Sequence, residues 1–353
     1  MNRRQAQVKV NLSALTHNLS IVRSVARHQK IMAIVKADAY GHGMIEAAGA
    51  LAAADALGVA FVSEGVALRE AGIDKPILVL EGARHELEVA WASKAGLMLV
   101  VHQEYQIQDL PDSLFLRPEL WLKLDTGMGR LGFPPQDAGQ LAHRLGSSCT
   151  TMMTHLACAD MPEDPANDAQ LARFEAAREN VQLPCSAANS AATFAFPQAR
   201  YDWVRPGIVL YGSSPFRDES AADLGLQPVM TMRAPIIAIR QHRKHDPIGY
   251  GGDYHCPADM PIGVIAAGYA DGYPRHAPPG TPVLVNGVEV QMVGRVSMDM
   301  ITVDLRDVPD VAVGDMATLW GNGMPVDYVA ARASTIAYEL LCNAGGHALI
   351  EYE

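Results

Sequence analysis

The sequence predicts an α/β fold in which a (β/α)8 barrel precedes a smaller, mostly β domain. Eight short apolar runs recur through the first 211 residues, and an amphipathic stretch follows most of them. This alternation is typical of a parallel sheet, and eight units favour its closure into a TIM-type barrel. After about residue 226 the strand-like runs continue with little helix between them. An open doubly wound sheet is the alternative for the first part, because a strand count taken from apolar runs can be off by one.

The eight predicted barrel strands are short and rich in aliphatic residues. Their ranges are 31–36, 57–62, 76–80, 97–101, 119–124, 150–156, 183–187 and 204–211. Near-continuous apolar runs of this length are typical of strands that are buried on both faces. The amphipathic stretches at 44–56, 63–72, 84–95, 136–146 and 166–181 have the spacing of helices that cover such a sheet.

The second part of the chain has the signals of antiparallel strands. Strand-like runs occur at 235–239, 262–266 and 281–285, and alternation continues from Met292 to Leu305. Asn286-Gly287 separates two apolar runs, which predicts a type I′ hairpin because both residues tolerate a positive φ. We therefore divide the chain into a barrel at residues 8–226 and a β-rich domain at 227–353, to which residues 1–7 could be added.

Composition limits the partners and the location. The chain of 353 residues is 49% hydrophobic, enough for two domains, and its net charge of −11 argues against nucleic acid or anionic membranes as partners. The apolar runs stay shorter than the ~18 residues that a membrane span needs. The first residues, 1–7, are basic but do not lead into the apolar region of a signal peptide. Five cysteines without C-x-x-C spacing are typical of reduced thiols, so we expect a cytoplasmic protein.

Lys36 stands at the carboxyl end of the first predicted strand. A turn with glycines at 41 and 43 follows it, and a helix is predicted from Met44. Lysine is rarely fully buried unless it is paired. The side chain is therefore either a desolvated amine that forms a Schiff base with a carbonyl, or a lysine that ends the strand and turns to water. The position alone does not decide between the two.

Other polar residues follow the later strands, at the end of a barrel where reactive groups lie. Lys123 and Asp125 follow the fifth strand, His155 the sixth and Asn189-Ser190 the seventh, and Arg205-Pro206-Gly207-Ile208 lies on the eighth. The loops after strands seven and eight commonly bind phosphate through backbone N–H groups. The simpler interpretation is an N-cap pair and a corner glycine. Beside a strand-end lysine, however, a phosphate-binding loop indicates pyridoxal 5′-phosphate (PLP).

Two other cofactor classes fit the sequence poorly. Residues 127–132 match the G-x-G-x-x-G pattern of dinucleotide-binding proteins, but Phe133-Pro134-Pro135 prevents the helix that should begin there, and the position about 20 residues later is apolar. His85-Glu86 lacks the second histidine of a zinc motif, and the remaining histidines are scattered. We therefore expect neither a nicotinamide site nor a metal site.

Seven longer motifs follow one another in a fixed order along the chain. They are Val35–Gly43, Lys123–Gly132, Asn189–Ala192, Trp203–Gly207, Gly249–Gly251, Gly268–Gly272 and Gly294–Asp299. Together they resemble the alanine racemase family of PLP enzymes over nearly the whole chain. The resemblance implies a cytoplasmic homodimer that interconverts L-alanine and D-alanine. It leaves open whether the role is D-alanine biosynthesis or alanine breakdown, and whether serine or larger amino acids are accepted.

The same resemblance implies a role for each site residue. Lys36, which also carries PLP, and Tyr250, which reaches the site of a partner subunit, would be bases on opposite faces of the substrate carbon. The cofactor would be held by Lys36, Tyr40, His155, Asn189, Ser190, Arg205, Gly207, Ile208 and Tyr338. Arg130, Met298 and Tyr269 would contact the substrate, and Lys123 matches a position that is carbamylated in many members.

Several alternatives stay open. A basic-amino-acid decarboxylase shares this architecture but favours a carboxylate where Arg205 is implied to meet the pyridine nitrogen, and a non-catalytic PLP carrier would not need Tyr250. Without the family context, Tyr250 would be a packing aromatic, and Lys123 could be an unmodified lysine paired with a carboxylate. Two features depart from the family pattern. Ser186 replaces a histidine behind Arg205, and residues 343–353 lack the expected basic and apolar tail, which concerns the dimer rim.

Overall fold

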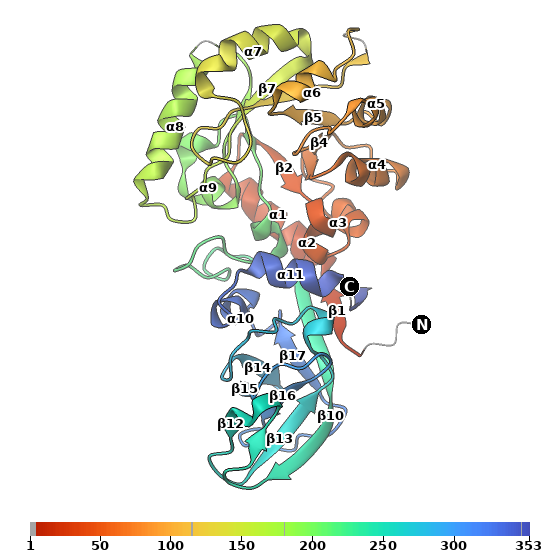
Figure 1. The fold of residues 1–353 in the computed structure, drawn as a ribbon, viewed down its shortest axis with the longest axis vertical. Helices are drawn as coiled ribbons and strands as arrows, with labels where there is room; N and C mark the ends of the chain where they lie inside the picture. Colours follow the sequence, from red (N-terminus) through yellow and green to blue (C-terminus); the bar gives the residue numbers. More distant parts are fainter. Residues whose placement is uncertain (1–4, 114–115, 180, 347) are drawn as a thin grey trace.

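Eight parallel strands form a closed barrel in the first part of the chain, which is the upper part of the molecule in Figure 1. The computed structural model describes residues 5–113, 116–179, 181–346 and 348–353. The strands are β2 (Lys30–Ile34), β3 (Ala56–Val59), β4 (Ile77–Val79), β5 (Met98–Val101), β6 (Leu120–Lys123), β7 (Cys149–Met153), β8 (Cys185–Ser186) and β9 (Trp203–Val204). Pairing of β2 with β9 closes the ring, so the predicted (β/α)8 barrel is confirmed and the open sheet is excluded.

Helices surround the barrel, and those that begin at Met44, Val62, Glu86, Ala138 and Pro165 lie at the predicted positions. They are α1 (Leu12–Val25), α3 (Met44–Ala50), α4 (Val62–Glu70), α5 (Glu86–Lys94), α6 (Glu104–Gln108), α7 (Ala138–Leu145), α8 (Pro165–Arg178) and α9 (Ser190–Ala195), with a short left-handed segment labelled α2 (Lys36–Gly41). Side-chain caps determine several starts. Asn11 accepts from the Ala14 N–H at 2.9 Å, and Asp164 caps α8 with Pro165 in its first turn.

The last barrel strand is much shorter than predicted. The prediction that Arg205 to Ile208 lie on a strand spanning 204–211 was wrong, because β9 ends at Val204. Pro206 has no N–H to give to a strand ladder, and Gly207 departs from the extended conformation (φ −121°, ψ −90°). The chain then turns into the 3-10 helix η5 (Ile208–Tyr211). Gly207 and Ile208 therefore lie in a loop beyond the strand.

The second part is a β domain below the barrel in Figure 1. Its strands are β10 (Met230–His242), β11 (Pro247–Ile248), β12 (Tyr254–His255), β13 (Met260–Ile265), β14 (Pro282–Val285), β15 (Val288–Val293), β16 (Ile301–Asp304) and β17 (Met316–Trp320). The sheet order is β13-β16-β15-β14-β17-β10, and β13 also pairs with β10, which closes the ring. Asn286 and Gly287 have φ values of 49° and 80° between the paired Val285 and Val288, so the predicted hairpin is confirmed.

Both ends of the chain join the β domain. Strand β1 (Gln7–Val10) pairs with β10, and β18 (Leu349–Tyr352) pairs with β1 in parallel. One cluster of buried apolar side chains runs through both parts, so the division at residues 226 and 227 stays a prediction. Over the described ranges, helices long and apolar enough to cross a membrane do not occur. All five cysteines are free thiols.

Two helices that the sequence analysis did not anticipate connect the β domain to the barrel. They are α10 (Val326–Arg332) and α11 (Ala337–Gly345), and α11 lies between the two parts of the molecule in Figure 1. It packs against α2 at a backbone-to-backbone distance that only glycine permits. A Cβ on Gly345 would lie 2.0 Å from the carbonyl oxygen of Gly41, and one on Gly41 would lie 2.3 Å from that of Leu341. The segment that carries Lys36 is thus pressed against the β domain.

We expect Gly345→Ala to lower the free energy of unfolding by at least about 2 kcal/mol, because the backbone that its Cβ would meet cannot move aside as a side chain could. Gly49→Ala is the matched control, since Gly49 is also helical and a Cβ there meets nothing within 4 Å. That control should raise stability by about 0.5–1 kcal/mol. Urea unfolding of both variants measures the difference, and equal effects would contradict the close packing of α2 and α11.

Candidate active site

The segment after β2 has an unusual backbone. The φ values of Ala37, Asp38, Ala39 and Tyr40 are all between 52° and 54°, which makes a left-handed turn without glycine at these four positions. Each such residue costs roughly 1–2 kcal/mol, so the surroundings must hold the turn in place. Glu64 does part of this, because its carboxylate accepts from the N–H groups of Ala37 (2.8 Å) and of the β3–α4 loop.

Lys36, Ala37 and Tyr40 of this segment line a cavity of about 590 Å³ at the carboxyl ends of the barrel strands. Eleven of the residues that the sequence analysis named line this one cavity: Lys36, Tyr40, Lys123, Arg130, His155, Asn189, Ser190, Arg205, Gly207, Ile208 and Tyr338. Glu81 and Cys342 also line it and were missed. Glu81 follows β4 closely and could have been found from its place at a strand end, whereas Cys342 lies on the unanticipated α11.

The cavity is strongly cationic. Lys36, Lys123, Arg130 and Arg205 line it, with the carboxylate of Glu81 as the acidic side chain. Burial lowers the pKa of Lys123 to about 8, and Arg205, Arg130 and Lys36 add to this effect. A cavity of this charge suits a ligand with several negative charges.

Asp125, whose carboxylate acts on the pKa of Lys123, is hydrogen-bonded elsewhere. Asp125 Oδ1 accepts from the N–H groups of Gly127 (2.9 Å), Met128 (2.9 Å) and Gly129 (3.1 Å). The G-x-G-x-x-G segment therefore wraps around a carboxylate of its own chain, which occupies the N–H groups that would otherwise approach a pyrophosphate. These contacts also argue against the alternative in which Lys123 is paired with a carboxylate.

Arg205 is almost fully buried and is surrounded by acceptors. Its guanidinium donates to Ser186 Oγ, to the Thr154 carbonyl at 2.7 Å and to His155 Nδ1 at 3.2 Å. Since arginine has only donors, His155 Nδ1 accepts. Burial lowers the pKa of Arg205 to about 10, and burial together with Arg205 holds the pKa of His155 well below its usual range. His155 is therefore neutral, with its proton on Nε2.

Ser186 stands behind Arg205, where the family pattern has a histidine. Its hydroxyl accepts from Arg205 and donates to the Trp203 carbonyl at 3.0 Å. The hydrogen bond behind the arginine is thus present, made by a hydroxyl in place of an imidazole.

Polar groups that suit a phosphate line one side of the cavity. Ser190 Oγ accepts from the Gly207 N–H at 2.8 Å, and a Cβ on Gly207 would lie 2.4 Å from the Tyr40 hydroxyl oxygen. Burial raises the pKa of Tyr40 and raises that of Tyr338 to about 12, so both phenols remain donors at neutral pH. Asn189 caps α9 by accepting from the Ala192 N–H at 3.0 Å, as its N-cap interpretation predicted.

Three of the named residues lie outside the cavity of their own chain. Tyr250, Met298 and Tyr269 are on the β domain with exposed fractions of 67%, 54% and 39%. The N–H of Tyr269 donates to the Ser297 carbonyl at 3.1 Å, and the next N–H donates to the carbonyl of Met298. The segments of Tyr269 and Met298 therefore lie side by side, and all three side chains are exposed to a second molecule.

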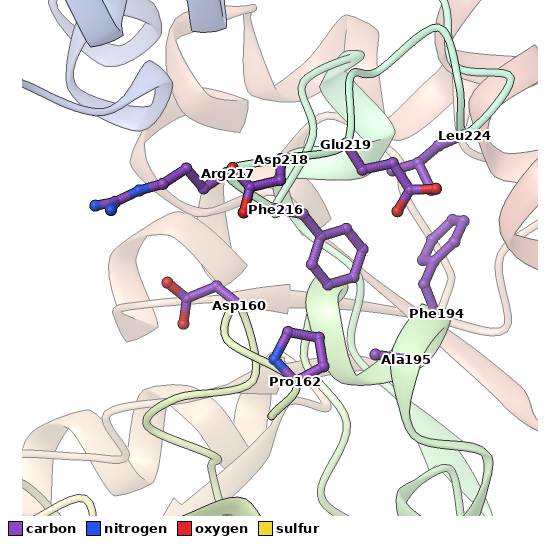
Figure 2. Close-up of a pocket in the computed structure, with 9 residues that line it drawn as sticks. All are labelled: Asp160, Pro162, Phe194, Ala195, Phe216, Arg217, Asp218, Glu219 and Leu224. Atoms are coloured by element: carbon purple, nitrogen blue, oxygen red, sulfur yellow. The ribbon is translucent and has the colours of Figure 1, made fainter. Parts of the chain in front are cut away.

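A different hollow, of about 440 Å³, lies on the flank of the barrel. Figure 2 shows Phe194 and Phe216 in it together with the carboxylates of Asp160, Asp218 and Glu219. It contains none of the site residues named from the sequence. Within the described residues, groups of three or more metal-ligating side chains are not found. Most of the predicted site residues thus lie together at the barrel mouth and not in this hollow.

Comparisons with known proteins agree with this geometry. The alanine racemase N-terminal domain family matches residues 10–215, and the alanine racemase C-terminal domain family matches residues 229–352. The chain belongs to the alanine racemase family. It is 48% identical to an alanine racemase of Thioalkalivibrio sulfidiphilus over 99% of both chains, and 47% identical to one of Halorhodospira halophila over 96% of this chain and 95% of the other.

Solved structures of alanine racemases have the same fold. The biosynthetic alanine racemase from Pseudomonas aeruginosa superimposes with a TM-score of 0.94 at 40% identity, over 99% of each chain. The alanine racemase from Acinetobacter baumannii gives a TM-score of 0.95 at 38% identity, over 99% of this chain and 100% of that one. The resemblance inferred from the motifs is therefore confirmed, and the chain is an enzyme of this family.

We expect Ser186→Ala to lower the free energy of unfolding by about 1–3 kcal/mol, because it leaves a buried guanidinium N–H without its acceptor. Ser24→Ala is the control, since the Ser24 hydroxyl bonds a carbonyl on an exposed helix face and should change stability by less than about 0.5 kcal/mol. Urea unfolding of the two variants tests this. Equal stabilities would mean that the hydroxyl does not support Arg205.

Proposed function

We propose that this chain is a PLP-dependent racemase that interconverts L-alanine and D-alanine, with Lys36 and Tyr250 as its two bases. The observation that carries the proposal is the cationic cavity around Lys36, lined by groups suited to each part of PLP. The names of relatives at up to 48% identity support alanine as the substrate. The free thiols support a cytoplasmic location.

The residues of the cavity fit PLP in both charge and shape. Tyr40, Ser190, Gly207, Ile208 and Tyr338 would hold the phosphate, where the two neutral phenols and the backbone donate to its oxygens. The close approach of the Tyr40 hydroxyl explains why position 207 is glycine. When bound, PLP supplies an electron sink that acidifies the α-proton of an attached amino acid. Lys36 would hold it covalently, and Asn189 would fix the start of α9 beside it.

Arg205 would donate to the pyridine nitrogen of PLP. Because its guanidinium has only donors, it would keep that nitrogen unprotonated and so limit side reactions such as transamination. A decarboxylase is less well supported, since it favours a carboxylate at the pyridine nitrogen, a place that Arg205 would take here. His155 would lie against the ring, and Arg130 would contact the phenolic oxygen and the substrate.

Racemisation needs a second base opposite Lys36, and the chain's own cavity provides no tyrosine for it beyond those assigned to the phosphate. One base takes the proton from one face of the substrate carbon, and the other returns a proton to the opposite face. The exposed Tyr250, with Tyr269 and Met298, would complete the site of a second copy. We therefore infer a homodimer in which each β domain covers the barrel mouth of its partner and keeps water from it.

The function is tested with purified protein and L-alanine. D-alanine should form, and Lys36→Ala should abolish both the absorbance of bound PLP and the racemisation. Tyr250→Phe should retain PLP and lose activity by about 10²–10⁴-fold, the usual contribution of one acid–base group. Bound PLP without any D-alanine, or amine products from a panel of amino acids, would contradict the proposal.

The contribution of Tyr250 across subunits is tested with two mixed dimers, isolated through different affinity tags. A dimer of one Lys36→Ala chain and one Tyr250→Phe chain should have about half of the wild-type activity, because one of its two sites is intact. A dimer of one wild-type chain and one chain with both substitutions should be nearly inactive. If Tyr250 served its own chain, the two results would be exchanged.

We also propose that Lys123 is carbamylated. Its nitrogen would attack carbon dioxide and release a proton, and Arg130 in the same cavity would neutralise the new carboxylate. The lowered pKa of about 8 favours this, since the neutral amine that reacts becomes abundant as the pH rises through 8, whereas an ordinary lysine remains charged until about 10.4. With ¹³C-bicarbonate at pH 8.5, NMR should detect a carbamate in the wild type that is absent in Lys123→Arg. If the signal persisted in the variant, the carbamate would be on another amine and not on Lys123.

A further inference from the structure

His42 lies directly behind the left-handed turn and is fully buried. Its Nδ1 is 2.9 Å from the Ala39 carbonyl oxygen and 3.0 Å from that of Tyr40. Both carbonyls belong to residues with φ of 54°. Its backbone N–H also donates into the turn, to Asp38 at 2.9 Å and to Ala39 at 3.1 Å. The residue therefore bonds the turn through both its side chain and its backbone.

The contacts of the imidazole show which of its two nitrogens carries the hydrogen. Carbonyl oxygens only accept, so Nδ1 carries the hydrogen. Nε2 is buried and has no hydrogen-bond partner, as expected of the bare nitrogen of a neutral ring. Burial lowers the pKa of His42 to about 4, although the two carbonyls oppose that effect. The ring is thus a neutral Nδ1–H donor throughout the physiological pH range.

The same ring begins a stack of aromatic side chains that leads to the cavity. It packs on Tyr211 with ring centroids 4.6 Å apart, and Tyr211 packs on Tyr40 at 4.7 Å. Tyr40 in turn contacts Tyr338 at 5.7 Å. The Tyr211 hydroxyl donates to the carbonyl of Ile34, the last residue of β2, at 2.8 Å. The stack therefore connects His42 with the strand before Lys36 and with two of the phenols that face the cavity.

The turn has a cost that these contacts must offset. Four consecutive left-handed residues are unfavourable for L-amino acids other than glycine, and carbonyls buried without a donor would add to this. A right-handed turn at the same place would send the Lys36 and Tyr40 side chains in different directions. The position of both groups thus depends on whatever satisfies the turn.

We propose that His42 is a positioning residue, whose Nδ1–H donor holds the left-handed turn so that Lys36 and Tyr40 meet in one cavity. The inference rests on the proposed function only in that it takes these two residues to hold PLP. His42 itself does not touch the cavity and takes no part in proton transfer. Its role is to satisfy the Ala39 and Tyr40 carbonyls from behind.

Three substitutions of His42 distinguish the effect of its N–H donor from the effect of its aromatic ring. His42→Phe keeps an aromatic ring against Tyr211 and removes the donor. His42→Asn places an N–H on the atom next to Cγ, as Nδ1 does, whereas His42→Gln places it one atom further, as Nε2 would. We expect the dissociation constant of PLP, titrated into the cofactor-free protein, to rise on the order of 10- to 100-fold in the Phe and Gln variants. The Asn variant should remain within about 5-fold of the wild type.

A second readout separates positioning from general damage. Because His42 is neutral, the loss in kcat should be the same across the pH range, and the pH profile of the Phe variant should keep its shape. In ¹⁵N-histidine NMR of the cofactor-free wild type, the His42 signals should be those of the Nδ1–H form. Equal rescue by Asn and Gln, wild-type PLP affinity in the Phe variant, or an Nε2–H signal would each overturn the proposal.

If the wild type binds PLP but forms no D-alanine, the proposed function fails, and the affinity series still tests His42. If the variants do not fold, as judged by thermal unfolding, the NMR of the wild type decides between the two ring forms on its own.

Discussion

The left-handed turn after Lys36 is the constraint on which the site depends. It is the point where the first barrel strand, the β3–α4 loop and α11 of the β domain meet. Each of these contacts acts on the backbone: Glu64 accepts an N–H, Gly345 permits the close approach of α11, and His42 donates to two carbonyls. A strained conformation that is held from several sides is rigid, which would suit the proposed role of Lys36 as a base.

The cavity has an excess of positive charge. Four cationic side chains lie together with little acid to balance them, which is unfavourable unless an anionic ligand completes the site. Arg205 shows how the protein tolerates this. Its buried guanidinium is satisfied by Ser186, Thr154 and His155, so that it keeps a fixed direction without a carboxylate partner. The pKa of Lys123 is lowered mainly by burial, and repulsion from Arg205, Arg130 and Lys36 adds to this effect.

Much of this arrangement could be predicted from the sequence, because parallel strands leave a regular signal. Apolar runs gave the barrel, and the strand-end rule led to Lys36, Lys123 and His155. The eighth strand was overestimated, since an apolar run cannot distinguish a strand from the 3-10 turn that follows Pro206. Helix α11 and Tyr338 had no local signal that ties them to the barrel, and Tyr338 was named through the family resemblance alone. The left-handed turn also escaped prediction, because it is imposed by tertiary contacts on residues that prefer other conformations.

The β domain contributes to the site in two ways. Within its own chain, α11 packs against the turn and brings Tyr338 to the cavity that Tyr40 also lines. Its exposed surface, with Tyr250, Tyr269 and Met298, lies away from that cavity and is suited to cover another. In the proposed homodimer each site therefore depends on both β domains, one as a support for Lys36 and the other as the source of the opposing base.

Placing the two proposed bases on different chains has a physical advantage. Lys36 and Tyr250 would approach the substrate carbon from opposite faces, which is difficult for neighbouring residues of one loop but would follow directly if a second subunit closed over the barrel mouth.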